Sequence, residues 1–102
     1  MLTCEHLELV NGWSNSYWGW GGEDDDMRKR ILHQGLVIWS YPKEMGTYKM
    51  LPHDQAPQNP GRFILLQKSE QNMAADGLNS LKYKLNSTSY HPLFTCINVD
   101  IS

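Results

Sequence analysis

The chain has 102 residues, of which 40% are hydrophobic and 20% are charged, and its formal net charge is −2. This is the composition of a globular protein, so we expect a folded domain or a piece of one rather than disorder. The small net charge provides no basic surface for nucleic acid or an anionic membrane, so neither is an expected partner. No apolar run approaches the ~20 residues of a membrane span. The start, MLTCEHLELV, lacks the basic and apolar parts of a signal peptide.

Two helices are predicted in the first third of the chain. Thr3 can cap a short helix to about Val10, which Asn11-Gly12 would end. A second helix is expected from Glu23 to the stop signal at Gly35. Its first turn is acidic and its last turn basic, an order that suits the helix dipole. Between the helices lies a loop rich in Gly and Trp.

The remainder alternates short strand-like and helix-like runs. The expected strands are 36–41, 47–51, 81–85 and 94–101; 52–61 is an expected loop, 63–66 a short apolar run and 69–75 a possible helix. This mixture predicts an α/β or α+β fold. The two cysteines, Cys4 and Cys96, are too few for a disulfide framework, so one bridge and two free thiols both remain open.

The densest chemical signal is the run YWGWGGEDDD at residues 17–26. Glycines let the backbone approach a ligand closely. Indole faces stack against the C–H face of a sugar ring, and ionised carboxylates accept hydrogen bonds from its hydroxyls. One carboxylate held against a hydroxyl can act as a general base. The run therefore indicates a carbohydrate site, although acids in a first helical turn can also serve only the helix dipole.

The run YWGWGGEDDD also resembles the signature of the β-1,4-galactosyltransferase family. Other segments fall in the family's order: Met50-Leu51-Pro52-His53 resembles its Met-x-x-His metal pair, and Asp76 to Leu81 (DGLNSL) and Val99-Asp100-Ile101 follow. The resemblance covers essentially all of residues 1–102, but only the C-terminal part of the family's catalytic domain. It implies an α/β fold, the later portion of a GT-A (Rossmann-like) glycosyltransferase fold without the nucleotide-binding half.

The resemblance implies an inverting transfer of galactose from UDP-galactose to the 4-hydroxyl of a terminal N-acetylglucosamine. Asp24 would be the general base. The other residues that the resemblance assigns to substrate binding are Tyr17, Trp20, Gly21, Glu23, Asp25, Arg62, Phe63 and Leu66. The segment from His53 to about Met73 would be a mobile loop that closes over the bound donor.

Met50 and His53 would be two manganese ligands in this resemblance. Their spacing alone argues weakly for a metal, because a thioether is a soft partner for hard manganese. The family's Asp-x-Asp motif, which supplies another ligand, is missing from these 102 residues. We therefore expect an incomplete manganese site and no transferase activity from this chain alone.

Three further points stay open. The alternative donor is UDP-N-acetylgalactosamine, and a non-catalytic sugar-binding module would use the same Trp and acid cluster. The family resides in the Golgi lumen behind a membrane anchor, which implies that location for a parent protein. There, the sequon Asn86-Ser87-Thr88 would be open to N-glycosylation.

Overall fold

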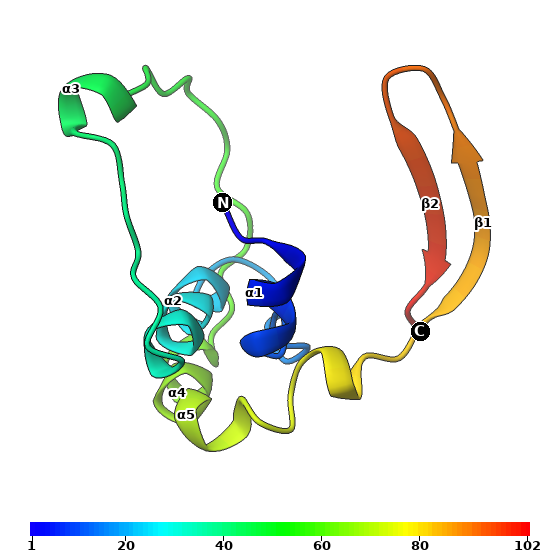
Figure 1. Ribbon diagram of the computed structural model, residues 1–102, viewed down its shortest axis with the longest axis horizontal. Coiled ribbons are helices and arrows are strands. Elements are labelled where there is room, and N and C mark those ends of the chain that lie inside the picture. Colours follow the sequence, from blue (N-terminus) through cyan, green and yellow to red (C-terminus); the bar gives the residue numbers. More distant parts are fainter.

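A computed structural model describes all residues 1–102. Its helices are α1 (Cys4–Leu9), α2 (Glu23–His33), α3 (Lys43–Gly46), α4 (Arg62–Gln67), α5 (Ser69–Asn72) and the 3₁₀ turn η1 (Leu78–Ser80); its strands are β1 (Lys84–Tyr90) and β2 (Thr95–Asp100). Figure 1 shows a helical body made of α1, α2, α4 and α5, from which two limbs extend. One limb carries α3 and the other is the β1–β2 hairpin.

Helix α1 begins and ends at the residues that the sequence indicates. The Thr3 side chain accepts a hydrogen bond from the His6 backbone N–H at 3.2 Å, and the His6 ring in turn faces the Thr3 backbone N–H. This reciprocal pair forms a capping box. Asn11 and Gly12, with φ of 58° and 64°, turn the chain out of the helix. His6 is half-buried and forms part of the cap.

Helix α2 is the centre of the body. Met27 is buried on one face, and the helix packs against both α4 and α5. The buried hydrophobic core is small and consists of Val10, Met27 and Met73. The helix ends at Gln34 and Gly35, where φ is 73° at the glycine. Both predicted ends of this helix are confirmed.

Two predicted strands are wrong. Residues 36–41 and 47–51 form no strand, and the short helix α3 lies between them. A strand needs a neighbour for its backbone hydrogen bonds, and neither segment has one within this chain. The apolar run 63–66 is the middle of α4, and the possible helix at 69–75 is confirmed as the shorter α5. The loop at 52–61 is irregular as expected.

The two C-terminal strands pair as an antiparallel hairpin. The second lies close to its predicted range, but the first begins at Lys84 rather than Leu81. A bulge between Leu85 and Ser87 shifts the register by one residue. The hairpin stands apart from the helices, and all its residues are exposed (Figure 1). Cys4 and Cys96 are both exposed and free, so the structure contains no disulfide.

No helix has the length and apolar composition required to cross a bilayer.

Candidate sugar-binding site

The acidic run at the start of α2 is divided between the surface and the interior. Glu23, Asp24 and Asp25 are exposed, whereas Asp26 is only 2% exposed. Successive residues of a helix point in directions about 100° apart, so the four acids cannot all face solvent, and Asp26 is the one directed into the body. The run therefore serves two purposes, a surface cleft and a buried ion pair.

The three exposed carboxylates line a cleft of about 320 Å³ between the start of α2 and α4. Its walls are Trp20, Gly21, Gly22, Glu23, Asp24, Asp25, Arg62, Phe63 and Leu66. Eight of the nine residues that the sequence assigns to substrate binding or catalysis meet here, although 36 residues lie between Asp25 and Arg62 in the chain. Only Tyr17 lies elsewhere. Gly22 also lines the cleft, although no sequence pattern assigned it a role.

Two loops are joined beneath this cleft. The backbone N–H of Trp20 donates to the Pro57 carbonyl, and the Asn59 N–H donates to the Trp20 carbonyl, both at 3.0 Å. These bonds form a short parallel bridge between Trp20 and Gln58. A Cβ at Gly19 would lie 3.1 Å from the Pro57 carbonyl oxygen, so the close approach favours glycine. The proline-rich loop is thereby held against the Trp loop.

Gly22 sets the entry into α2. It occupies the N-cap position with φ of 97° and makes no side-chain cap. A Cβ there would lie 2.8 Å from Cε1 of Tyr17 and 3.3 Å from Cβ of Arg62. Both the positive φ and the crowding exclude a larger residue without movement. The glycine lets Tyr17, the helix start and α4 approach one another.

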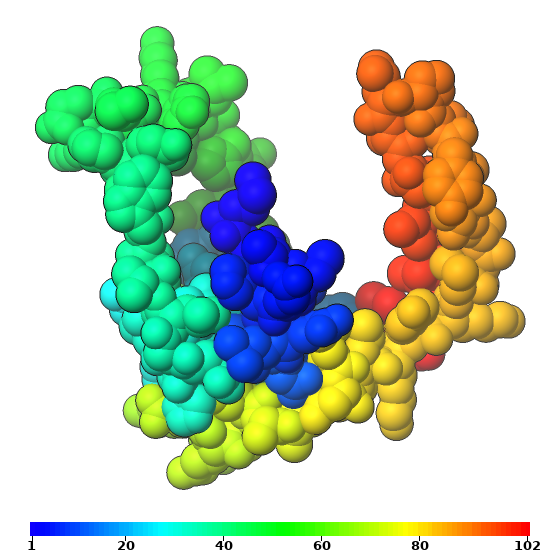
Figure 2. All heavy atoms as spheres, in the orientation of Figure 1, coloured from blue at the N-terminus to red at the C-terminus, as the bar shows by residue number.

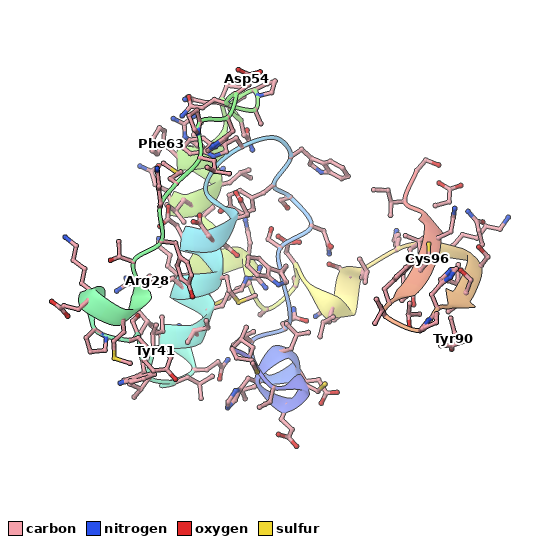
Figure 3. All side chains as sticks on the ribbon, turned by 90° about the horizontal axis from the view of Figure 1, so that it is seen from above. Arg28, Tyr41, Asp54, Phe63, Tyr90 and Cys96 are labelled. Carbon is pink, nitrogen blue, oxygen red and sulfur yellow. The ribbon has the colours of Figure 1, made fainter.

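An aromatic and cationic wall faces the acids across the cleft. The Arg62 guanidinium carbon lies 4.4 Å from the Phe63 ring centre and 5.8 Å from the Trp20 ring centre. Arg62 is also fixed by a 3.1 Å hydrogen bond to the Asn59 carbonyl. Trp20 is 48% exposed and Phe63 64% exposed, so both present ring surface to a ligand. In Figure 3, Phe63 lies far from Tyr90 and Cys96 of the hairpin.

Asp24 lines the cleft with one carboxylate oxygen free of hydrogen bonds within the chain. Its Oδ1 accepts a 2.9 Å hydrogen bond from the Asp25 backbone N–H, and its Oδ2 accepts none from the chain. The side chain is exposed on the first turn of α2. One carboxylate oxygen is therefore oriented by the helix start while the other is open to a hydroxyl group.

A buried polar network lies under the cleft. Asp26 receives Nε of Arg30 at 2.7 Å and the Ser69 hydroxyl at 2.5 Å, and Arg30 is 1% exposed. Arg30 also donates to the carbonyl oxygens of Asn11 and Gly12, at 3.4 and 3.3 Å. The network ties α2 to α5 and to the end of α1. The i,i+4 spacing of Asp26 and Arg30 is a sequence pattern from which this ion pair could have been predicted. No pattern in the sequence indicates that Ser69 joins them.

Tyr17 belongs to this network rather than to the cleft. Its hydroxyl lies 3.4 Å from Oδ1 of Asp26. Burial and the neighbouring Asp26 carboxylate raise the pKa of Tyr17 to about 12. The Tyr17 ring packs against Gly22. Tyr17 therefore contacts a residue that lines the cleft without lining the cleft itself.

Asp76 fixes the loop that precedes the Trp run. Its carboxylate accepts hydrogen bonds from the Ser14 and Ser16 hydroxyls and from the Asn15 backbone N–H. Burial opposes ionisation, but these three hydrogen bonds and nearby Arg30 outweigh it and hold the pKa of Asp76 below its ordinary value. The Asp76-Gly77 turn thus anchors residues 14–16 from 60 positions away.

Met50 and His53 do not form a metal site by themselves. Both are exposed, and neither lines the cleft. The Nδ1 atom of His53 lies 3.2 Å from the Leu51 carbonyl oxygen. The chain contains no group of three His, Cys, Asp or Glu side chains that could hold a metal ion. A thioether and one imidazole do not fit manganese, which prefers several oxygen ligands.

Comparison with known proteins identifies relatives of the whole chain. Residues 1–54 match a family model described as the N-terminal domain of galactosyltransferase. β-1,4-Galactosyltransferase 3 of Bos taurus is 44% identical over 98% of this chain, and β-1,4-galactosyltransferase 1 of Mus musculus is 42% identical over the same share. The chain belongs to the β-1,4-galactosyltransferase family.

The similarity extends to structure. The catalytic domain of Drosophila β1,4galactosyltransferase 7, solved as a complex with xylobiose, superposes with a TM-score of 0.70 at 26% identity. That match covers 96% of this chain and 45% of the solved chain. The mixed helices and hairpin therefore correspond to part of a galactosyltransferase catalytic domain. The chain spans about a quarter of the length of the curated relatives, 26% for the two β-1,4-galactosyltransferases named above.

Proposed function

We propose that this chain is the acceptor-binding part of an inverting galactosyltransferase, with Asp24 as the general base. The observation that carries the proposal is the cleft in which Asp24, with one free carboxylate oxygen, faces Trp20, Arg62 and Phe63. Carboxylate oxygens accept hydrogen bonds from sugar hydroxyls, and aromatic rings stack against the C–H faces of sugar rings. Membership of the β-1,4-galactosyltransferase family and the sugar-bound Drosophila relative support the same assignment.

In the proposed reaction, the 4-hydroxyl oxygen of N-acetylglucosamine attacks the anomeric carbon of UDP-galactose. The new C–O bond forms as the bond to the UDP oxygen breaks, and the hydroxyl proton passes to Asp24. A single displacement inverts the anomeric carbon and requires no enzyme nucleophile. Glu23 and Asp25 hold other acceptor hydroxyls, while Phe63 and Leu66 provide apolar surface for the acetamide methyl group.

We further propose that the chain corresponds to the later portion of a GT-A catalytic domain that acts in the Golgi lumen. Met50 and His53 contribute to a manganese site only together with further oxygen ligands. Residues 53–73 close over the donor as a mobile loop, a movement that would carry Arg62, Phe63 and Leu66 with α4 because all three lie within this segment.

A chimera tests the role of Asp24. The matched quarter of bovine β-1,4-galactosyltransferase 3 is replaced by these 102 residues, and transfer from UDP-galactose to N-acetylglucosamine is measured. We expect Asp24→Asn to lower kcat by at least about 100-fold, the usual contribution of a positioned base, with little change in acceptor affinity. Glu70→Gln, an exposed change on α5, is the matched control. An active Asp24→Asn chimera would exclude the proposed base.

Two alternatives are outcomes of the same experiment. A non-catalytic sugar-binding module would bind N-acetylglucosamine but give an inactive chimera even with Asp24 intact. A transferase that prefers UDP-N-acetylgalactosamine is identified by supplying both donors in competition. The ratio of the kcat/KM values for the two donors then assigns the specificity.

A further inference from the structure

The hairpin carries the one N-glycosylation sequon of this chain. Of the seven asparagines, only Asn86 is followed two positions later by Ser or Thr, in the run Asn86-Ser87-Thr88. All three residues lie in β1, and all three are exposed. None of them lines the sugar cleft. The motif is therefore accessible and lies outside the proposed active site.

Asn86 occupies the irregular point of the strand ladder. The register shifts between Leu85 and Ser87, so Asn86 is the extra residue of a β-bulge. A bulge residue has no neighbour directly opposite it, so no cross-strand pair encloses its side chain. In Figure 2 the hairpin, coloured orange and red, stands clear of the helical body over most of its length. The Asn86 side chain therefore has room for an attached group.

The two faces of the hairpin differ in polarity. Residues directly opposite each other in an antiparallel pair point to the same face. The more apolar face comprises the pairs Leu85–Val99, Thr88–Ile97 and Tyr90–Thr95. The polar face comprises the pairs Lys84–Asp100, Ser87–Asn98 and Ser89–Cys96. The polar face can stay in water, as antiparallel sheets commonly allow on one side.

The Asn86 side chain belongs to the polar face. Its Nδ2 atom donates a 3.1 Å hydrogen bond to Oδ1 of Asn98, which is on that face. A glycan is bulky and hydrophilic, so it suits a surface that remains in water. Attachment is also compatible with this hydrogen bond. The amide nitrogen carries two protons, of which one is lost on attachment and the other can still be donated to Asn98.

We propose that Asn86 carries an N-linked glycan on the polar face of the hairpin. The donor is an oligosaccharide on a polyprenyl diphosphate. Nδ2 of Asn86 forms a bond to the anomeric carbon of the first sugar while the bond from that carbon to the diphosphate oxygen breaks. One amide proton is released, and the polyprenyl diphosphate leaves. The proposal rests on the proposed function in one respect, the Golgi location, because N-glycosylation takes place along the secretory route.

Mapping of the modified residue tests the proposal. The bovine chimera that contains these 102 residues is produced in mammalian cells behind a cleavable secretory signal. Its peptides are analysed by mass spectrometry before and after a peptide N-glycosidase, which converts a glycosylated Asn into Asp. We expect residue 86 to be converted only after the enzyme treatment. An unmodified Asn86 would overturn the proposal.

Three variants identify the sequon as the cause of the modification. Asn86→Gln and Thr88→Ala should each abolish the glycan, because each removes an essential residue of the sequon. Asn98→Gln, which changes only the hydrogen-bond partner, is the matched control and should keep it. A glycan that persists in Thr88→Ala, or that is lost in Asn98→Gln, would contradict the assignment.

Two further readouts test the position of the glycan. In cells that make only high-mannose glycans, a matching endoglycosidase should cleave the native chimera to the same extent as the denatured one, because the polar face is exposed. Cleavage only after denaturation would overturn that placement. Asn86→Gln should leave kcat unchanged, since the hairpin shares no residue with the cleft. The glycan is read independently of turnover, so an inactive but glycosylated chimera would count against the proposed function and support the modification.

Discussion

Arg30 and Asp26 form a buried ion pair on α2 beside the proposed sugar cleft, with Nε of Arg30 2.7 Å from Oδ2 of Asp26. The pair explains how four consecutive acids are tolerated at one helix start. Three face solvent, and the fourth is neutralised by a guanidinium that also holds the end of α1. This buried ion pair therefore fixes the direction of α2, whose first turn lines the cleft.

Removing the buried carboxylate should unfold the body. Asp26→Ala removes the closest carboxylate from the buried Arg30 guanidinium, which keeps only a 3.9 Å contact with Asp76 and two carbonyl acceptors. Breaking a buried ion pair in this way costs about 3–5 kcal/mol. This is a large share of the stability of a small domain. Urea denaturation followed by circular dichroism measures the loss. Asp25→Ala, one residue away but exposed, is the control and should change stability by less than about 0.5 kcal/mol. Equal effects of the two changes would contradict the buried support.

Gly22 should be intolerant of a side chain. Gly22→Ala combines a left-handed φ of 97° with a contact of 2.8 Å to Tyr17, and we expect a loss of about 1–3 kcal/mol together with weaker sugar binding. Gly35→Ala is the matched control, because its φ is 73° but nothing lies within 4 Å of the added Cβ. The difference between the two unfolding free energies reports the crowding at Gly22, chiefly the contact with Tyr17. No difference would mean that Tyr17 moves freely.

Alkaline pH should weaken the fold through Tyr17. Its pKa is raised from 10.0 to about 12 in the folded chain because burial and Asp26 disfavour the phenolate. The unfolded chain therefore loses this proton first, and the stabilisation present below pH 10 declines as pH rises towards 12. Tyr17→Phe has no phenol proton to lose. The urea concentration at its unfolding midpoint should therefore fall less steeply as the pH is raised over this range. An identical pH profile for both proteins would contradict this assignment.

The 102-residue chain alone should be inactive and should not bind manganese tightly. No group of three metal-binding side chains is present, and a thioether with one imidazole holds manganese weakly. We expect no turnover of UDP-galactose with N-acetylglucosamine and manganese, and no saturable heat in a calorimetric titration with manganese chloride. Measured turnover, or a dissociation constant in the micromolar range, would refute this expectation.

Local chemistry in the sequence determined helices α1 and α2 and most of the cleft. Thr3, Asn11 and Gly35 mark helix ends because capping and positive φ depend on adjacent residues. The run from Trp20 to Asp25 indicated a sugar site because its aromatic, glycine and acidic groups are neighbours in the chain. The resemblance to β-1,4-galactosyltransferases, which the comparisons confirm, added Arg62, Phe63 and Leu66.

Tertiary structure alone decided which of these groups face a ligand. Asp26 and Tyr17 belong to the same run as Asp24 and Trp20, yet their side chains point inward. Asp26 accepts hydrogen bonds there from Arg30 and Ser69, and the Tyr17 hydroxyl lies beside Asp26. Residues 36–41 have the composition of a strand but form none, since pairing requires a partner that no local pattern can supply. Backbone caps are satisfied within a few residues, whereas burial, ion pairing and strand pairing depend on groups distant in the chain.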